Sequence, residues 1–185
     1  VVVRYWARGV VEPVGAATGD ACVTPEESLK ASLGVGLPIL GIPEELGGIS
    51  EHRSAMASTL VAEALAKGDM GIAVGTLASG AVATALGLWG TEAQQETYLP
   101  AFTGDEVPAA ALALSEPTPL FDPLAPNTKA VRDGEEIVLN GLKSAVARGH
   151  EAELFIVGAE LDGKPVLFLV ESATEGLEVE ADPSM

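Results

Sequence analysis

The pattern of hydrophobic and polar positions changes near Glu106. Before it, long apolar stretches are bounded by capping residues, glycine and proline, which is typical of helices. After it, apolar runs are short and separated by turn residues, which is typical of strands. The pattern predicts an α+β chain in which an all-α N-terminal part precedes a β-rich part.

The first helices are predicted from their apolar faces and their ends. Residues 1–17 are apolar and carry two arginines four positions apart, which indicates a helix with one solvated face. The sequence TPEE at 24–27 supplies an N-cap threonine, a proline at the first helical position and a glutamate three residues after the cap. Glycines and a proline within 34–38 end that helix. The sequence GIPEELGG at 41–48 predicts a loop.

Three further helices are expected before the pattern changes. Ser50 is the predicted N-cap of a helix that runs to about Lys67. An uncharged stretch follows at 70–90. The sequence TEAQ at 91–94 then forms a second capping box, and the helix that it starts is expected to break near Pro100, because proline lacks the amide hydrogen.

The β-rich part shows two strong hairpin signals, the dipeptides Asp133-Gly134 and Asp162-Gly163. It stops at Met185 without an obvious closing element, so we expect a fragment or a chain whose remainder is missing. Strands are predicted at 109–115, 128–132, 136–139, 154–159, 166–170 and 177–179.

The uncharged stretch at 70–90 is long enough to cross a membrane. It is rich in alanine, glycine, serine and threonine, and Gly71 and Gly75 have the small-residue spacing of closely packed helices. Neither flank carries the cluster of lysine and arginine that marks a membrane boundary. We therefore expect a buried helix rather than a membrane span.

Charge and cysteine content limit the classes of function and the cellular locations to be expected. The net charge is −17 and no basic run interrupts it, which disfavours nucleic-acid binding and is typical of a soluble surface. Cys22 is alone, so no intrachain disulfide can form and a reducing, cytoplasmic location is expected. No signal-peptide pattern is seen at the start.

Common catalytic and metal-binding patterns are missing from the sequence. His52 and His150 have no metal-ligand spacing with each other or with Cys22, so no metal site is expected. No nucleophile elbow, phosphate-binding loop or dinucleotide fingerprint occurs. The pair Glu44-Glu45 is interpreted as a solvated turn.

One stretch carries candidate chemistry, the sequence LALSEPTPLFDP at 112–123. An apolar strand ends there in Ser-Glu-Pro, where backbone groups and the Ser115 hydroxyl could fix a flat, hydrogen-bonding ligand. An ordinary transition from strand to loop explains the residues equally, so both interpretations stay open on the residues alone.

Four sequence blocks, in order, resemble the acyl-CoA dehydrogenases, flavoenzymes that remove two hydrogens from the α and β carbons of acyl-CoA thioesters. The resemblance implies an N-terminal helical domain at 1–107 and an incomplete β-barrel-like middle domain at 108–185, with the C-terminal four-helix bundle of the family outside the sequence. The blocks are GIPEELGG (41–48), GTEAQQETYLP (90–100), ALSEP (113–117) and TKAVRDGEEIVLNGLK (128–143).

The resemblance implies FAD as cofactor. Some of the family's flavin-binding positions are kept in this chain and others are replaced. Leu114 and Ser115 match the strand end that bonds the flavin ring, where the family has Thr-Glu-Pro and this chain has Ser-Glu-Pro. Ala145 stands where the family has a tryptophan over the flavin, and Ala147 where it has a hydrogen-bonding threonine. Phe121 replaces a serine that contacts the substrate.

These departures have different consequences. One lost neutral hydrogen bond costs about 0.5–1.5 kcal/mol, so Ala147 weakens flavin binding by roughly tenfold at most. Phe121, by contrast, overfills the passage for the thioester. The family's catalytic base lies in the missing bundle, so no catalytic residue is assigned.

Two interpretations of the function therefore stay open. In one, the chain belongs to an FAD-dependent enzyme of fatty-acid or steroid side-chain β-oxidation, with acyl-CoA as substrate. In the other, it is a non-catalytic partner subunit or a duplicated half of such an enzyme, with a degenerate flavin and substrate site. A homo- or hetero-oligomer with an acyl-CoA dehydrogenase-like subunit is expected by resemblance.

Overall fold

The computed structural model describes residues 26–49, 51–104 and 106–180. The chain divides into two compact units, Val1–Pro108 and Ala109–Met185, each with its own packing. The helix predicted over 1–17, the proposed cap at Thr24 and the single cysteine lie outside the described residues.

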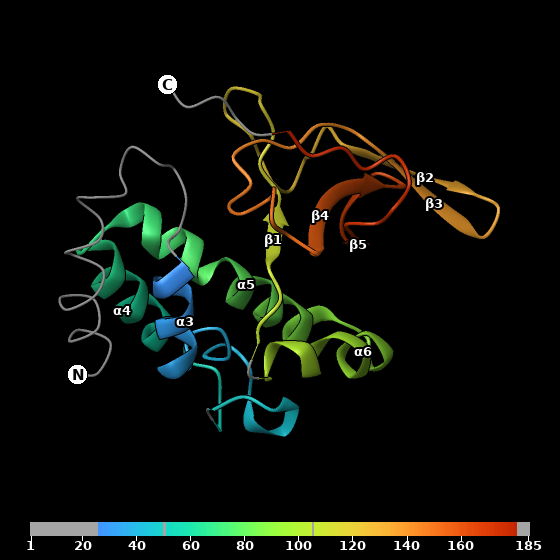
Figure 1. Cartoon of the computed structure of the whole chain (residues 1–185). Helices are drawn as coiled ribbons and strands as arrows, with labels where there is room; N and C mark the ends of the chain where they lie inside the picture. Colours follow the sequence, from blue (N-terminus) through green and yellow to red (C-terminus); the bar gives the residue numbers. More distant parts are fainter. Residues whose placement is uncertain (1–25, 50, 105, 181–185) are drawn as a thin grey trace. The chain divides into compact units, whose positions relative to one another are not determined.

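The described part of the first unit is helical (Figure 1). The helix predicted after the TPEE sequence, the uncharged helix and the capping box at Thr91 are all confirmed. The assignment of Ser50 as an N-cap is wrong, because Ser54 accepts the hydrogen bond from the backbone of Ala57 and the helix begins after it. The elements are α3 (Glu26–Gly34), the short 3-10 helix η2 (Glu44–Leu46), α4 (Ala55–Ala66), α5 (Met70–Trp89) and α6 (Glu92–Phe102).

Helix α5 is the central helix of this unit. It is long and apolar enough to cross a membrane by length and composition, but 61% of its most apolar window is buried within the structure. It contacts α3, α4 and α6, and Figure 1 shows it running between α3 and α4 towards one end and α6 towards the other. Near its start, Ile72 and Ala73 pack with Leu37 and Leu65. The expected close-packed helix is therefore what the structure shows.

Helix α6 does not break at Pro100, so that prediction was wrong. The helix continues through Pro100 to Phe102. Proline removes one donor to the backbone carbonyl four residues earlier, at the exposed Glu96, where water can replace it. Leu99 and Phe102 are only 2% and 1% exposed, and burial of these two side chains holds the last turn in place.

The second unit is a mixed sheet of five strands. β1 and β2 both pair parallel to β4, at Ala110–Ala113 and at Lys129–Ala130 respectively, while β5 pairs antiparallel to it along its whole length. The described sheet is open and not closed into a barrel, which corrects the barrel-like expectation. The strands are β1 (Ala110–Ala113), β2 (Lys129–Asp133), β3 (Glu136–Asn140), β4 (Leu154–Leu161) and β5 (Lys164–Glu171).

Both predicted hairpins are present. Asp162 and Gly163 have φ of 52° and 76° between β4 and β5, the left-handed pair that a two-residue hairpin requires. Gly134 has φ of 63° between β2 and β3, and Figure 1 shows this hairpin projecting from the rest of the sheet. The strand predicted at 177–179 is not formed; instead Leu177 packs against the sheet core.

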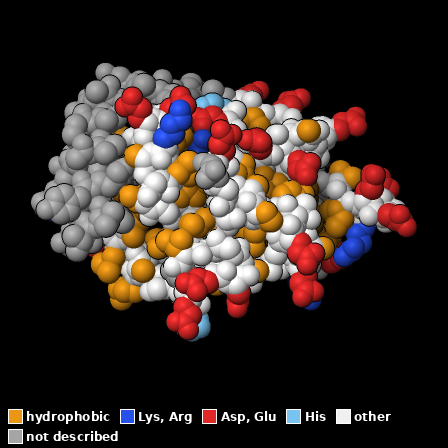
Figure 2. Space-filling model, turned by 60° about the horizontal axis from the view of Figure 1, so that its bottom comes forward, with side chains coloured by type: hydrophobic (Ala, Val, Ile, Leu, Met, Phe, Trp, Pro, Cys, Tyr) orange, Lys and Arg blue, Asp and Glu red, His pale blue; other side chains and the backbone are white. Residues whose placement is uncertain are grey.

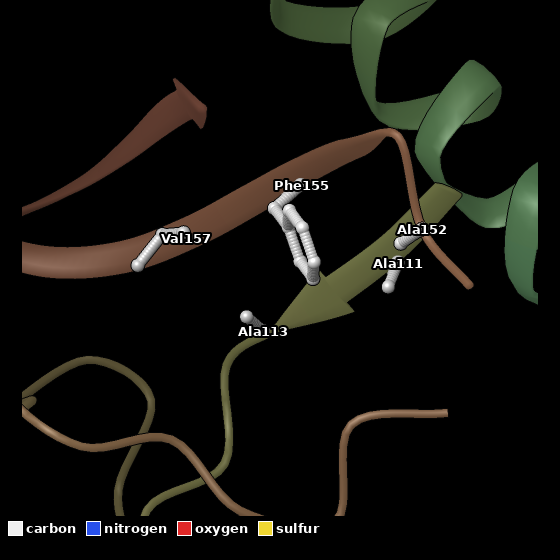
Figure 3. Packing of buried hydrophobic residues seen from close by; sticks show 5 residues of the cluster. All are labelled: Ala111, Ala113, Ala152, Phe155 and Val157. Atoms are coloured by element: carbon white, nitrogen blue, oxygen red, sulfur yellow. The ribbon is translucent and has the colours of Figure 1, made fainter. Parts of the chain in front are cut away.

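Small side chains build the core of the sheet (Figure 3). Ala111 and Ala113 of β1 face Phe155 and Val157 of β4, with Ala152 beside them. The one large ring occupies the space that the alanines leave open, as close packing requires. The pairing of β1 with β4 ends at Ala113, so Leu114 and Ser115 follow directly after the last paired residue.

The GIPEELGG loop depends on a close backbone approach at Gly48. A Cβ added there would lie 1.7 Å from the carbonyl oxygen of Ile42, which is fully buried. Gly47 beside it has φ of 88° and ends η2. The two glycines are therefore required by geometry, in agreement with the predicted loop.

We expect Gly48→Ala to lower the free energy of unfolding by about 1–3 kcal/mol, the usual cost of overfilling a packed site. Gly34→Ala is the matched control, because its added Cβ would meet no atom within 4 Å. Chemical denaturation of both variants tests this. Equal stability of the two variants would show that the contact with Ile42 relaxes freely.

Candidate functional site

Acidic side chains are spread over the surface, and Figure 2 shows them around one face with few basic ones between them. The pair Glu44-Glu45 is exposed in a turn, as interpreted from the sequence. Glu116 is the exception: within the described residues it is the one buried acidic residue, with 6% exposure. It lies directly after Ser115, at the end of the strand that carries the candidate chemistry.

The Glu116 carboxylate accepts four hydrogen bonds. Oε1 accepts from the Thr128 backbone nitrogen at 2.9 Å, from the Thr128 hydroxyl at 2.6 Å and from Lys143 Nζ at 2.8 Å. Oε2 accepts from the Asn127 backbone nitrogen at 2.8 Å. The group thus ties the end of β1 to the start of β2 and to the loop after β3.

These bonds decide the charge state of Glu116. Burial by itself would raise the pKa of the carboxyl group, but the hydrogen bonds from Lys143 and Thr128 outweigh it and hold the pKa far below its usual range. The group is therefore a carboxylate throughout the physiological range. Its partner Lys143 is itself 11% exposed, so the ion pair is shielded from water.

Lys143 and Ser144 join the loop after β3 to the strand end. Lys143 Nζ donates to the Leu114 carbonyl at 3.1 Å, and the Ser144 backbone nitrogen donates to the Ser115 carbonyl at 3.0 Å. Consecutive residues of the loop thus bind consecutive carbonyls of the strand end. The loop that continues into 145–147 is thereby bonded to the strand end at 114–115.

The predicted flavin positions differ in exposure. Leu114 is half-buried and Ser115 is exposed, so the Ser115 hydroxyl is accessible. Ala145 is exposed and Ala147 half-buried. Lys143 and Ser144, which precede Ala145 in the chain, bond the strand end, while the roles of these four positions toward a flavin stay a prediction.

Phe121, the predicted obstruction of the substrate passage, lies beside the same lysine. It is half-buried, and Lys143 Nζ is 6.0 Å from the centre of its ring, within reach of a cation–π interaction. The loop that carries it turns sharply, since Leu120 has φ of 56° and is fully exposed. Phe121 therefore faces the ion pair, and Leu120 faces away into solvent.

An apolar hollow of about 240 Å³ opens beside the strand end. Leu114 forms one wall, and Pro126, Gly158 and Leu167 line it from the neighbouring loop and from β4 and β5. A side chain at Gly158 would come within 3.1 Å of Leu114, so this glycine keeps the hollow open. Leu114 thus contacts the polar site through its carbonyl and the apolar hollow through its side chain.

The loop after β3 carries backbone strain. Ala145 and Arg148 have φ of 52° and 57°, a conformation that costs non-glycine residues about 1–2 kcal/mol. Arg148 is held by two hydrogen bonds to Glu151 Oε2, at 3.0 and 2.7 Å. Strain of this kind concentrates at functional sites, where surrounding contacts enforce it.

Metal chemistry finds no support in the described part of the chain. No group of three or more histidine, cysteine, aspartate or glutamate side chains is close enough there to hold a metal ion. His52 and His150 are both exposed and lie in separate units.

Sequence reasoning missed the ion pair at the centre of this site. In the sequence, Glu116 stands out only as part of Ser-Glu-Pro, and Lys143 only as the last residue of TKAVRDGEEIVLNGLK. No local signal marks Glu116 as buried, since its neighbours Ser115 and Pro117 are both exposed. Its partner lies 27 residues later, and no local spacing identifies it.

Comparison with known proteins identifies the family. The model of the acyl-CoA dehydrogenase N-terminal domain matches residues 2–106, and that of the acyl-CoA dehydrogenase middle domain matches residues 111–185. The two domains occur in the family's order and together cover nearly the whole chain. The chain therefore belongs to the acyl-CoA dehydrogenase family, which confirms the resemblance seen in the sequence.

Individual relatives agree with this assignment. The bovine (Bos taurus) short/branched chain specific acyl-CoA dehydrogenase is 30% identical over 96% of this chain and 41% of its own length. A Mycobacterium smegmatis glutaryl-CoA dehydrogenase in complex with FADH2 is 26% identical, with a TM-score of 0.79 over 94% of this chain and 44% of its own. The FAD complex of PigA is 25% identical, with a TM-score of 0.82 over 99% of this chain and 49% of its own.

The chain spans less than half the length of the first curated relatives that it matches.

We expect Glu116→Gln to lower the free energy of unfolding at neutral pH by about 3 kcal/mol or more, because it leaves the Lys143 ammonium buried without its counter-charge. The carboxylate has a lower pKa in the folded than in the unfolded protein, so the unfolded state takes up the proton first as the pH falls. The Glu116 contribution is therefore fully present above the ordinary glutamate pKa of 4.5 and is lost progressively as the pH falls below it towards the lower pKa of the folded state. The variant should lack this part of the acid destabilisation.

Denaturation curves of wild type and variant between pH 7 and pH 3 measure both effects. Glu160→Gln is the control, since its pair with Lys129 is much more exposed and is expected to contribute less than about 1 kcal/mol. Equal losses of stability in the two variants would show that the buried Glu116 pair contributes no more than the exposed Glu160 pair.

Proposed function

We propose that this chain is part of an enzyme that performs FAD-dependent α,β-dehydrogenation of acyl-CoA thioesters, in fatty-acid or steroid side-chain β-oxidation. The observation that carries the proposal is the match of both domain models in order. The bonds from Lys143 and Ser144 to the strand end support it, because they join the two segments that carry the positions assigned to the flavin.

The residues present fit a flavin in part. Ser115 offers an exposed hydroxyl, and Leu114 contributes a backbone held in place by Lys143. Ala145 and Ala147 offer neither an aromatic ring nor a side-chain donor. Bound FAD would supply the hydride acceptor for the reaction, while these residues bind and orient the ring.

Glu116, the carboxylate nearest to Ser115 in sequence, is not suited to remove the α-proton. Its oxygens are already occupied by four donors and its pKa is strongly lowered. A general base works best with a pKa near the working pH. We therefore propose that the base comes from outside this chain segment.

A second function is favoured by a specific set of residues. Phe121 beside Lys143, with Ala145 and Ala147 in the loop, fits a supporting subunit or duplicated half whose own site is degenerate. Such a chain would assemble with an acyl-CoA dehydrogenase-like partner that carries the complete site. The single cysteine supports a cytoplasmic location for either form.

The absorbance spectrum of the purified full-length protein separates the two functions. We expect a flavin band that bleaches when acyl-CoA is added anaerobically to the protein alone. If the protein alone shows no flavin, and a bleaching band appears only with a co-encoded partner, the supporting role is correct. Absence of flavin under both conditions would contradict both functions.

We expect Ala147→Thr to tighten FAD binding by up to about tenfold, because one neutral hydrogen bond contributes about 0.5–1.5 kcal/mol. Ala125→Thr, in the exposed loop after Phe121, is the matched control and should leave affinity unchanged. Fluorescence titration of the apoprotein with FAD measures both. Equal FAD affinities of the two variants would show that residue 147 does not contact the flavin.

A further inference from the structure

We propose that Lys143 is a positioning residue that polarises the peptide group between Leu114 and Ser115, and so makes the Ser115 backbone N–H a strengthened donor toward an electron-rich atom of the flavin ring. The inference rests on the proposed function for the identity of the acceptor. The polarisation itself follows from the contacts of this chain alone.

The peptide group between Leu114 and Ser115 has a cation on its carbonyl side. Lys143 Nζ donates to the Leu114 carbonyl at 3.1 Å. No cis peptide bond occurs among the described residues, so the Ser115 N–H points away from that carbonyl, on the opposite side of the same planar group. A cation bonded to the oxygen withdraws electron density through the resonance of the group and makes the N–H more acidic.

The Ser115 N–H is available to a ligand. It has no acceptor among the hydrogen bonds of the described residues, and the Ser115 side chain is exposed. The same residue is nevertheless fixed, because its carbonyl accepts from the Ser144 backbone nitrogen at 3.0 Å. A fixed and unpaired donor at a strand end is pre-organised for binding.

Burial makes the effect of Lys143 large. Its side chain is 11% exposed and that of Glu116 is 2% exposed, so the charge acts through protein rather than through water. Glu116 holds the ammonium against the strand end by a second bond at 2.8 Å. Glu116 thereby fixes the direction of the lysine, and Lys143 acts on the peptide group.

The test compares Lys143→Met with Lys129→Met in the full-length protein. Lys129 belongs to a more exposed pair with Glu160 in the same sheet, with a side chain that is 52% exposed. Methionine keeps most of the length of the lysine stem and removes the charge in both variants. We expect about three- to tenfold weaker FAD binding for Lys143→Met only, together with a lower reduction potential of the bound FAD.

Residue-resolved amide hydrogen exchange supplies a readout that needs no flavin. Exchange in neutral solution is catalysed by hydroxide, which removes the amide proton, so loss of the polarising cation should slow exchange at Ser115. The Ser144 amide should exchange faster in the same variant, because the loop is less firmly held. Opposite changes at these two amides are the expected signature of Lys143→Met.

A double variant, Glu116→Gln with Lys143→Met, separates polarisation from simple stability. It removes both charges, so no buried charge is left unpaired and folding is expected to recover. If Lys143 acts by polarisation, slow Ser115 exchange and weak FAD binding persist in the double variant. Recovery of both to wild-type values, or unchanged Ser115 exchange in Lys143→Met, would overturn the inference.

Failure of the proposed function has a different signature. If the wild-type protein binds no FAD, with or without a partner, the acceptor of the Ser115 N–H is not a flavin. Slow Ser115 exchange in Lys143→Met would still support the strengthened donor in that case.

Discussion

The buried ion pair between Glu116 and Lys143 holds together three segments that are far apart in the sequence. Through it, the end of β1, the start of β2 and the loop after β3 meet around one carboxylate with four donors. Replacing one partner would strand a charge that water cannot reach, which is far more costly than losing an exposed pair. Together with the bond from the Ser144 backbone nitrogen to the Ser115 carbonyl, this contact holds the loop after β3 against the strand end.

Sequence patterns predicted the helices and hairpins well, because their signals are local. Caps such as Thr91, the uncharged stretch of α5 and the Asp-Gly turns each act within a few residues. The errors arose where tertiary packing overrode local preference, as at Pro100, which buried neighbours hold within a helix. The open sheet also could not be foreseen, since strand order is set by pairing between distant segments.

The sequence resemblance proposes residues for the candidate site but does not reveal the contacts that join their segments. Ser115, Phe121, Ala145 and Ala147 came from resemblance, and the structure brings their segments together. What joins them is a contact across 27 positions between Glu116 and Lys143, and no spacing rule reveals such a pair. The positive φ at Ala145 was equally invisible, because alanine gives no sign of an unusual backbone conformation.

The projecting hairpin of β2 and β3 has a consequence for self-association. Only Lys129 and Ala130 of β2 pair with β4, so most of the hairpin has neighbours on one side only, and Val131 and Val138 are exposed as a cross-strand pair. Such an edge is a template for aberrant strand addition and fibril growth. The acidic residues at its tip, Asp133, Glu135 and Glu136, oppose this by repelling an identical hairpin, the role that gatekeeper charges play beside apolar strands.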